Sequence, residues 1–154
     1  MRYLYYLIGL MAVAALGYYL ILPYFSKSFS REVLVYFNQV KENEIVQLPV
    51  KRVIAPYDDP MTQAIKELLK GPTEEEQAQG FSTALNEGTE LNYIRVEDGA
   101  ATLDFNERFD TPMGGSARVI SIYQQLDRTM KQFPGISEIK LTINRGEREA
   151  VLEP

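Results

Sequence analysis

The stretch that decides the fold is LNYIRVEDGAATLDF, residues 91–105. Apolar side chains alternate with polar ones on both sides of the central Asp98-Gly99 pair, at Ile94, Val96, Ala101, Leu103 and Phe105. This alternation is typical of half-buried strands, and a two-residue Asp-Gly link predicts a type I′ hairpin, in which both central residues take positive φ. We therefore interpret Asp98 as a turn residue and not as a catalyst.

Upstream of the hairpin, the sequence predicts two strands and a helix. Residues 33–37 are apolar or aromatic throughout and rich in β-branched side chains, which indicates a buried strand, and residues 45–54 form a second extended run broken by Pro49. We expect a loop between them, at residues 38–44. Asp59-Pro60 then begins an amphipathic helix that ends before Gly71-Pro72, and its predicted core face consists of Met61, Ala64, Ile65, Leu68 and Leu69.

A short helix and a loop are expected next. Thr73 and Glu76 have the spacing of a capping box, which predicts a short helix over residues 74–79. The carboxylates of Glu74, Glu75 and Glu76 then complement the helix dipole, and we favour this interpretation over a cation site. Residues 81–88 are expected to connect this helix to the hairpin.

Downstream of the hairpin, a second amphipathic helix begins after Gly114-Gly115, with Ser116 as the expected N-cap. Its predicted core face consists of Val119, Tyr123, Leu126, Met130 and Phe133, and its predicted outer face of Gln124, Gln125, Asp127, Arg128 and Lys131. A strand at residues 139–143 and an edge strand at residues 150–152 complete the pattern. The expected fold is α+β: a two-layer sandwich in which two main helices cover one mixed sheet of about five or six strands.

The amino terminus is apolar. No charged residue occurs from Tyr3 to Leu22, and tyrosines flank an aliphatic interior. A run of about 20 apolar residues matches the hydrocarbon thickness of a bilayer, so we predict a membrane-spanning helix through residues 3–22. The alternatives are a cleaved signal peptide and a buried soluble helix. The predicted organisation is an anchor at 1–25, a stalk at 26–32 and one folded domain at 33–154.

The amino-acid composition argues against several classes of function. The chain has 16 basic and 21 acidic residues, a net charge of −5, which does not fit a nucleic-acid footprint. It has no cysteine and no histidine, so it lacks thiolate chemistry and the commonest general base. We expect a protein that is not an enzyme and that binds no nucleic acid.

Three groups of residues are candidate sites for a ligand or for catalysis. Asp104, Glu107 and Asp110 could converge on a cation, but they lack the spacing of a calcium loop. The Gly114-Gly115-Ser116 turn lacks the lysine and spacing of a phosphate-binding loop. The adjacent carboxylates of Asp58 and Asp59 are better explained by helix capping than by hydrolysis. We therefore predict no catalytic, cofactor-binding or metal-ligating residues.

The order of short motifs resembles the GerMN domain, the sporulation and spore-germination domain, from about Val33 to Leu152. The motifs are VYF at 35–37, LPVKR at 48–52, GPT at 71–73, FSTAL at 81–85, EGT at 87–89, VEDGAATLDF at 96–105 and QFPGI at 132–136. One departure is Asn86, where the family has proline, and we expect it to loosen that loop. The family fold is similar to the ring-building motifs of secretion-system and sporulation-channel proteins.

The resemblance implies a non-enzymatic, extracytoplasmic domain at the cytoplasmic membrane that assembles with cell-envelope proteins or with itself. It also implies a link to sporulation or germination. No cofactor is expected. The alternative is a module that binds a small ligand or a cell-wall fragment in a groove lined by Tyr36, Tyr57, Tyr93 or Tyr123.

Overall fold

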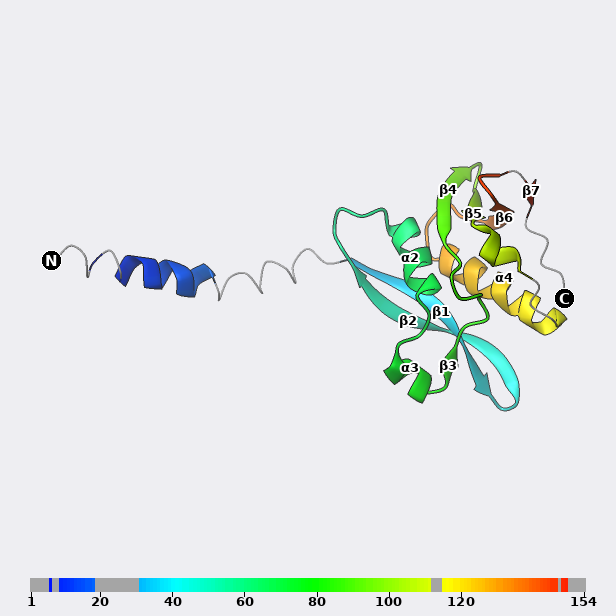
Figure 1. Ribbon diagram of the computed structural model, residues 1–154, viewed down its shortest axis with the longest axis horizontal. Coiled ribbons are helices and arrows are strands. Elements are labelled where there is room, and N and C mark those ends of the chain that lie inside the picture. The colour runs from blue at the N-terminus through cyan, green and yellow to red at the C-terminus, as the bar shows by residue number, and fades with distance from the viewer. Residues whose placement is uncertain (1–5, 7–8, 19–30, 112–114, 147, 150–154) are drawn as a thin grey trace. The chain divides into compact units, whose positions relative to one another are not determined.

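The computed structural model describes residues 6, 9–18, 31–111, 115–146 and 148–149 (Figure 1). Residues 9–18 are helical. Within these ranges, no helix combines the length and the apolar character needed to cross a membrane, so the predicted transmembrane helix is not found there. Part of the predicted segment 3–22 and most of the predicted stalk, residues 26–32, lie outside the described residues.

The strands form two sheets, which corrects the prediction of one sheet of five or six strands. The first has the order β2-β1-β3 and the second the order β4-β5-β6-β7. The strands of the first sheet are β1 (Arg31–Lys41), β2 (Glu44–Ile54) and β3 (Phe81–Ser82). Those of the second are β4 (Leu91–Glu97), β5 (Ala100–Phe105), β6 (Glu138–Ile143) and β7 (Arg148–Glu149).

The β4–β5 hairpin confirms the Asp-Gly prediction. Asp98 and Gly99 have φ values of 51° and 84°, and Glu97 pairs with Ala100 across the turn. Strand β6 then pairs with β5 in parallel, from Ala100↔Glu138 to Phe105↔Ile143, and β7 pairs antiparallel with β6. The expected edge strand at residues 150–152 lies outside the described residues.

The β1–β2 hairpin is longer than predicted. The residues expected to form a loop at 38–44 continue both strands up to a two-residue turn at Glu42 and Asn43, whose φ values are 52° and 68°. In a hairpin of this kind, counting back from the turn places the N–H side of Pro49 on the outer edge of β2. Because β2 is the outermost strand of its sheet, this proline removes no hydrogen bond from the ladder.

Helices α2 (Pro60–Leu69) and α3 (Glu74–Ala78) begin where the sequence predicts. Asp59 caps α2 by accepting a 2.8 Å hydrogen bond from the Thr62 amide, and Thr73 with Glu76 forms a capping box at α3. In α2, Ala64, Ile65 and Leu68 are fully buried, as the spacing of the apolar residues predicts. The segment after α3 differs from prediction, because β3 lies where a loop was expected and pairs with β1.

The core joins the two sheets through the helices. Phe37 of β1, Leu68 of α2 and Leu103 of β5 belong to one buried apolar cluster, together with residues of α4 (Ser116–Met130). The short 3₁₀ helix η1 (Glu107–Asp110) adds Phe109, whose ring stacks on that of Phe105 with 4.4 Å between centroids. Both sheets therefore depend on a shared core.

The core face of α4 agrees with the prediction in part: Leu126 and Met130 are fully buried, as expected. Tyr123, which was also expected in the core, is 43% exposed, and Gln125, which was expected on the outer face, is buried together with Ser121 and Thr129. The N-cap is also different: Gly115, with φ of 92°, precedes the first helical residue, Ser116. The helix is thus rotated relative to the apolar stripe, and it buries polar side chains.

These polar side chains bind the backbone of β1. Gln132, just after α4, accepts a hydrogen bond from the Leu34 amide (2.8 Å) and donates one to the Leu34 carbonyl (2.7 Å). Thr129 Oγ1 accepts from the Tyr36 amide, and Gln125 Nε2 donates to the Tyr36 carbonyl (3.1 Å). Helix side chains thus occupy the edge of β1 where another strand would pair, which explains why the second sheet does not continue the first.

Replacing Gln125 by leucine should destabilise the protein strongly. Its amide is fully buried and bridges the Ala84 N–H and the Tyr36 carbonyl, so leucine would leave both backbone groups unpaired. We expect a loss of about 2–4 kcal/mol in the free energy of unfolding, measured by urea denaturation. Gln124→Leu is the matched control, and an equal loss in both variants would contradict the role given to Gln125.

Candidate interaction site

A groove of about 510 Å³ lies between the end of α2 and the segment that enters β4. We call it the α2–β4 groove, and it is lined by Lys66, Leu69, Lys70, Gly88, Thr89, Glu90 and Leu91. Leu69 and Leu91 are partly buried and pack against the main core cluster. The groove therefore has apolar walls that the core holds in place.

The groove is lined by charged residues of both signs. Lys66 lies on α2, Lys70 is the C-cap of that helix, and Glu90 carries the opposite charge. Lys70 pairs with Glu67, whereas Lys66 forms no ion pair with any residue that the structure describes. Thr89 is 7% exposed, and its hydroxyl has no hydrogen-bond partner among the described residues.

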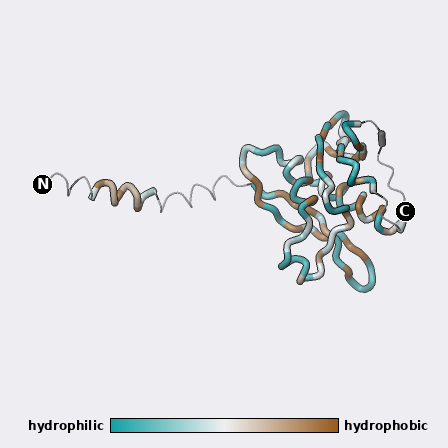
Figure 2. Tube along the Cα trace, in the orientation of Figure 1, coloured by the Kyte–Doolittle hydropathy of each residue, from teal (hydrophilic) through white to brown (hydrophobic). Residues whose placement is uncertain are grey.

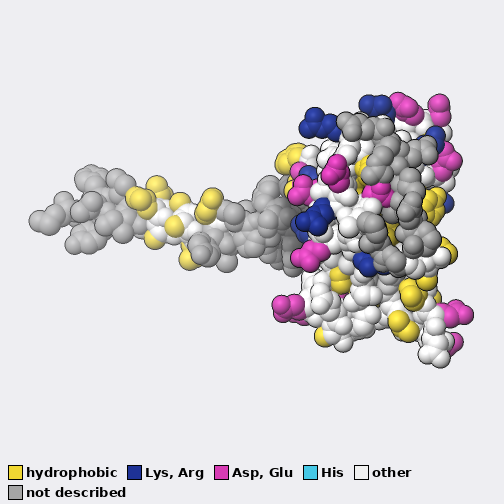
Figure 3. All heavy atoms as spheres, turned by 45° about the vertical axis from the view of Figure 1, so that its right-hand side comes forward, with side chains coloured by type: hydrophobic (Ala, Val, Ile, Leu, Met, Phe, Trp, Pro, Cys, Tyr) yellow, Lys and Arg dark blue, Asp and Glu magenta, His cyan; other side chains and the backbone are white. Residues whose placement is uncertain are grey.

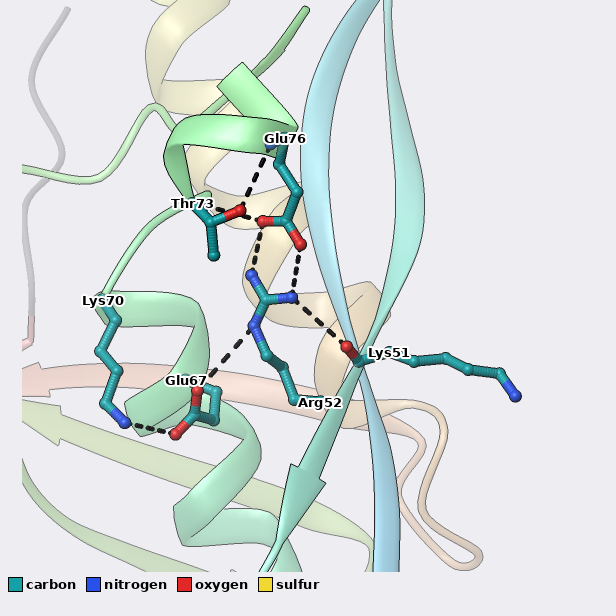
Figure 4. A network of polar contacts seen from close by, with 6 residues as sticks. All are labelled: Lys51, Arg52, Glu67, Lys70, Thr73 and Glu76. Atoms are coloured by element: carbon teal, nitrogen blue, oxygen red, sulfur yellow. Dashed lines mark hydrogen bonds and ion pairs between the residues drawn. The ribbon is translucent and has the colours of Figure 1, made fainter. Parts of the chain in front are cut away.

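An arginine network fixes α2 and α3 against β2 (Figure 4). Arg52 of β2 makes two parallel hydrogen bonds of 2.6 Å to the carboxylate of Glu76, and its Nε lies 3.8 Å from Glu67. These three side chains are only 14–17% exposed, and the guanidinium also lies over the Phe37 ring. The Lys51 side chain points away from the network. The hydrogen bonds between Arg52 and Glu76 raise the pKa of Arg52 and lower the pKa of Glu76.

A second network surrounds Asp104 on β5, which is fully buried. Its carboxylate accepts hydrogen bonds from Asn92 (2.8 Å) and Thr142 (2.7 Å), and from the backbone amides of Arg145 (2.9 Å) and Gly146 (2.7 Å). Asn92 lies at an irregularity in the β4–β5 pairing. Burial by itself would raise the pKa of Asp104, but these four hydrogen bonds lower it below its ordinary value.

The candidate cation ligands are not brought together. Asp104 is surrounded by donors, and Glu107 accepts a hydrogen bond from Asn144. The part of the chain that the structure describes contains no group of three or more acidic residues that could hold a metal ion. Of the Gly114-Gly115-Ser116 turn, Gly114 lies outside the described residues.

The tyrosines considered for a ligand groove do not meet in the α2–β4 groove. Its lining includes none of Tyr36, Tyr57, Tyr93 and Tyr123. Tyr57 is 93% exposed, and Tyr93 packs beside Arg95 on β4. Sequence reasoning also missed the groove, because its two walls come from residues about 20 positions apart. The nearest signals were the Gly71-Pro72-Thr73 and Glu87-Gly88-Thr89 motifs that flank it.

Comparison with known proteins places this fold in a family. A match to the family Germane, described as sporulation and spore germination, covers residues 34–149. The chain belongs to the Germane family. The resemblance to GerMN domains inferred from the sequence motifs is thereby confirmed.

Individual relatives agree with this assignment. The chain is 29% identical over 123 residues to the spore germination protein GerM of Bacillus subtilis, covering 77% of this chain and 32% of that protein. It therefore spans about a third of the length of that curated relative. The tandem GerMN domains of B. subtilis GerM match with a TM-score of 0.65 and 24% identity, over 82% of this chain and 47% of theirs.

Two further solved structures share the fold. The first GerMN domain of B. subtilis GerM matches with a TM-score of 0.52 and 25% identity, over 77% of this chain and 85% of that domain. A putative lipoprotein from Clostridium perfringens matches with a TM-score of 0.55 and 15% identity, over 80% of each chain. At that identity the lipoprotein supports the fold alone.

Asn86, which departs from the Germane pattern, does not loosen its loop as predicted. Its Nδ2 donates to the carbonyls of Arg108 (2.9 Å) and Thr111 (3.2 Å), and its Oδ1 accepts from Arg118 of α4. Arg118 also donates to the Ala84 carbonyl. The asparagine thus ties the loop to η1 and α4, a different means of restraint from a proline.

Asp104→Asn should destabilise this Germane domain and flatten its acid response. Asparagine would have to present an N–H₂ group to the donors that surround the carboxylate. Because the pKa is lower in the folded chain, the charge contributes fully above the ordinary value of about 3.9 and is lost as pH falls through the folded pKa. We expect a loss of about 2–3 kcal/mol at pH 7 and a shallower fall in stability below about pH 4, measured by urea unfolding across pH.

Asp98→Asn is the control for this change, because it removes the same charge from an exposed turn. Its stability profile should follow that of the unaltered chain. A pH profile of Asp104→Asn that remained parallel to that of the unaltered chain would contradict the account of Asp104.

Arg52→Gln should cost about 1–3 kcal/mol of stability, because it leaves the largely buried Glu76 without its cation, whereas Glu67 keeps its pair with Lys70. Lys51, the neighbour of Arg52, forms an exposed pair with Glu32, so Lys51→Gln should change stability by less than about 0.5 kcal/mol. A double-mutant cycle of Arg52→Gln with Glu76→Gln should give a coupling energy of about 1–2 kcal/mol. A coupling energy near zero would show that the bidentate pair does not contribute to stability.

Proposed function

We propose that this Germane domain is a non-enzymatic module for protein–protein assembly in a cell-envelope complex, linked to sporulation or germination. Its partners are envelope proteins or further copies of itself, and it works on the outer side of the cytoplasmic membrane. The observation that carries the proposal is that β2 and β4 each lie at one end of a sheet, with no further strand beside them among the residues that the structure describes; the short strands β3 and β7 lie at the opposite ends.

Outermost strands present backbone N–H and C=O groups that can pair with another chain. In β4, alternation from the Glu97↔Ala100 pair places the backbone groups of Ile94 and Val96 on the outer edge, and Val96 is 44% exposed. In β2, Ile45 and Val53 are more than half exposed. These edges resemble the surfaces by which proteins add strands to one another.

The buried charged groups Arg52, Glu76 and Asp104 already have partners within the fold, so their charges stabilise the structure. Arg52 with Glu76 joins β2 to α3, and Asp104 joins β5 to the turn after β6. On the face drawn in Figure 3, acidic and basic side chains are interspersed with patches of apolar ones. Such a mixed surface suits specific contacts between proteins.

The link to spores follows from the relatives. The matched protein of B. subtilis is named a spore germination protein, and the tandem domains belong to a sporulation protein. Because the chain spans only about a third of that relative, the partners of this chain and the stage at which it acts are part of the proposal.

The alternative of an aromatic groove for a cell-wall fragment is not favoured. The four tyrosines on which it rested do not line the α2–β4 groove, whose walls are aliphatic and charged.

Affinity capture of the full-length chain from gently solubilised envelopes tests the proposal. We expect envelope proteins or additional copies in stoichiometric amounts, identified by mass spectrometry and by the mass of the intact assembly. A fusion of the tag to residues 1–32 alone is the control, since it reveals proteins retained by the apolar amino-terminal stretch. A chain recovered as a monomer, with nothing beyond what the control retains, would contradict the proposal.

A further inference from the structure

The β1–β2 hairpin has a turn at one end and an open end at the other. Counting back from the turn at Glu42 and Asn43 pairs Glu32 with Val53 at the open end. The 2.9 Å ion pair between Lys51 and Glu32 agrees with this register, because it joins diagonal neighbours on one face. We call the end formed by Glu32 and Val53 the hairpin base. The amino-terminal part of the chain enters the hairpin there, and the link to α2 leaves from there.

The link from the hairpin base to α2 is short and carries an exposed aromatic ring. Ile54 at the end of β2 is buried, Asp59 caps α2, and only residues 55–58 lie between them. Tyr57 in this link is 93% exposed, the largest exposed fraction of any large hydrophobic side chain that the structure describes. Val53 at the hairpin base is 66% exposed. The domain thus presents apolar surface to its surroundings at this end.

The chain length before the hairpin base argues for what meets this surface. The run from Tyr3 to Leu22 carries no charge, and Figure 2 shows hydrophobic colours along most of its helical residues 9–18. A run of this composition partitions from water into lipid. Nine residues, 23–31, separate it from Glu32. Even fully extended, this segment keeps the hairpin base within about 35 Å of the end of the apolar run.

The charges around the hairpin base have both signs. Glu32 and Lys51 neutralise each other in their ion pair, and the exposed Arg31 and Asp58 carry opposite charges. No excess of one sign therefore attracts the hairpin base to anionic lipid. A contact of this surface with lipid depends on the burial of apolar area instead.

We propose that the hairpin base faces a lipid surface and that the ring of Tyr57 inserts at the level of the headgroups. Tyrosine suits this position because its ring is apolar and its hydroxyl group is polar. The inference rests on the membrane location in the proposed function and names lipid as a second partner of the domain. At about 3.3 Å per residue, the eight positions from Val53 to Ile45 place the turn up to about 26 Å farther from the lipid.

The absence of tryptophan makes this contact measurable by fluorescence. Tyr57→Trp gives the full chain a single tryptophan, and the chain is reconstituted into phosphatidylcholine vesicles. We expect its emission maximum to lie at the shorter wavelength of a ring removed from water. We also expect a large loss of emission when part of the lipid is replaced by lipid brominated near the headgroup end of its acyl chains.

Val40→Trp is the matched control, because Val40 is 68% exposed and lies at the turn end of the same hairpin. Its emission should remain at the wavelength of a tryptophan in water, and brominated lipid should not quench it. Circular dichroism of both variants confirms that the domain is folded.

A second measurement keeps the native tyrosine. The chain has no cysteine, so Ala55→Cys places a single thiol at an exposed position two residues before Tyr57. In vesicles this thiol should react with a water-soluble maleimide several-fold more slowly than the thiol of Val40→Cys. Each rate is divided by the rate of the same chain unfolded in urea. Adding Tyr57→Ser to Ala55→Cys should restore the fast reaction, because the ring that holds the link at the lipid is lost.

The outcomes separate this inference from the proposed function. A chain that does not float with the vesicles overturns the lipid contact and contradicts the proposed membrane location. A chain that floats while Tyr57→Trp is neither shifted nor quenched overturns the lipid contact alone, and assembly is still tested by capture of partners. Equal quenching of Val40→Trp overturns the proposed orientation. Quenching confined to Tyr57→Trp, with protection at residue 55 that depends on Tyr57, would establish the contact.

Discussion

The fold depends on the binding of the β1 backbone by polar side chains of α4 and the residue just after it. A strand in the middle of a domain must have its N–H and C=O groups satisfied on both sides. On one side β1 pairs with β2. On the other side it pairs with β3 only at Asn38 and Gln39, and at Leu34 and Tyr36 the side chains of Gln125, Thr129 and Gln132 supply the donors and acceptors that a strand would supply. This arrangement ends the first sheet, buries α4 against it, and leaves the second sheet to pack through the shared core.

Local patterns were enough to predict most of the elements. The Asp98-Gly99 turn, the Asp59 cap and the Thr73–Glu76 capping box each depend on residues within a few positions of one another, and the structure contains all three. The division into two sheets could not be predicted in this way. The division depends on Gln125 of α4 and Gln132 just after it, which bind a strand about 90 positions earlier. A prediction from the spacing of apolar residues places such polar side chains on the surface.

The same limit applies to the candidate site. Asp104 and Glu76 were both examined as possible ligands of cations, but their partners are other parts of the fold. Asp104 gains two of its hydrogen bonds from backbone amides about 40 positions away, and Glu76 gains Arg52 from β2. A carboxylate whose oxygens are already occupied by donors stabilises the junction of two elements, and no spacing in the sequence distinguishes it from a ligand.

These internal junctions define which surfaces remain for partners. Where α4 reaches β1, the backbone and Asn38 are occupied, whereas Val40 and Ile45, nearer the turn, are exposed. Helix α2 is held to β2 by the contact between Arg52 and Glu67, and its end forms one wall of the groove beside β4. The interactions that stabilise the fold therefore also determine which backbone edges and side chains remain available to a partner.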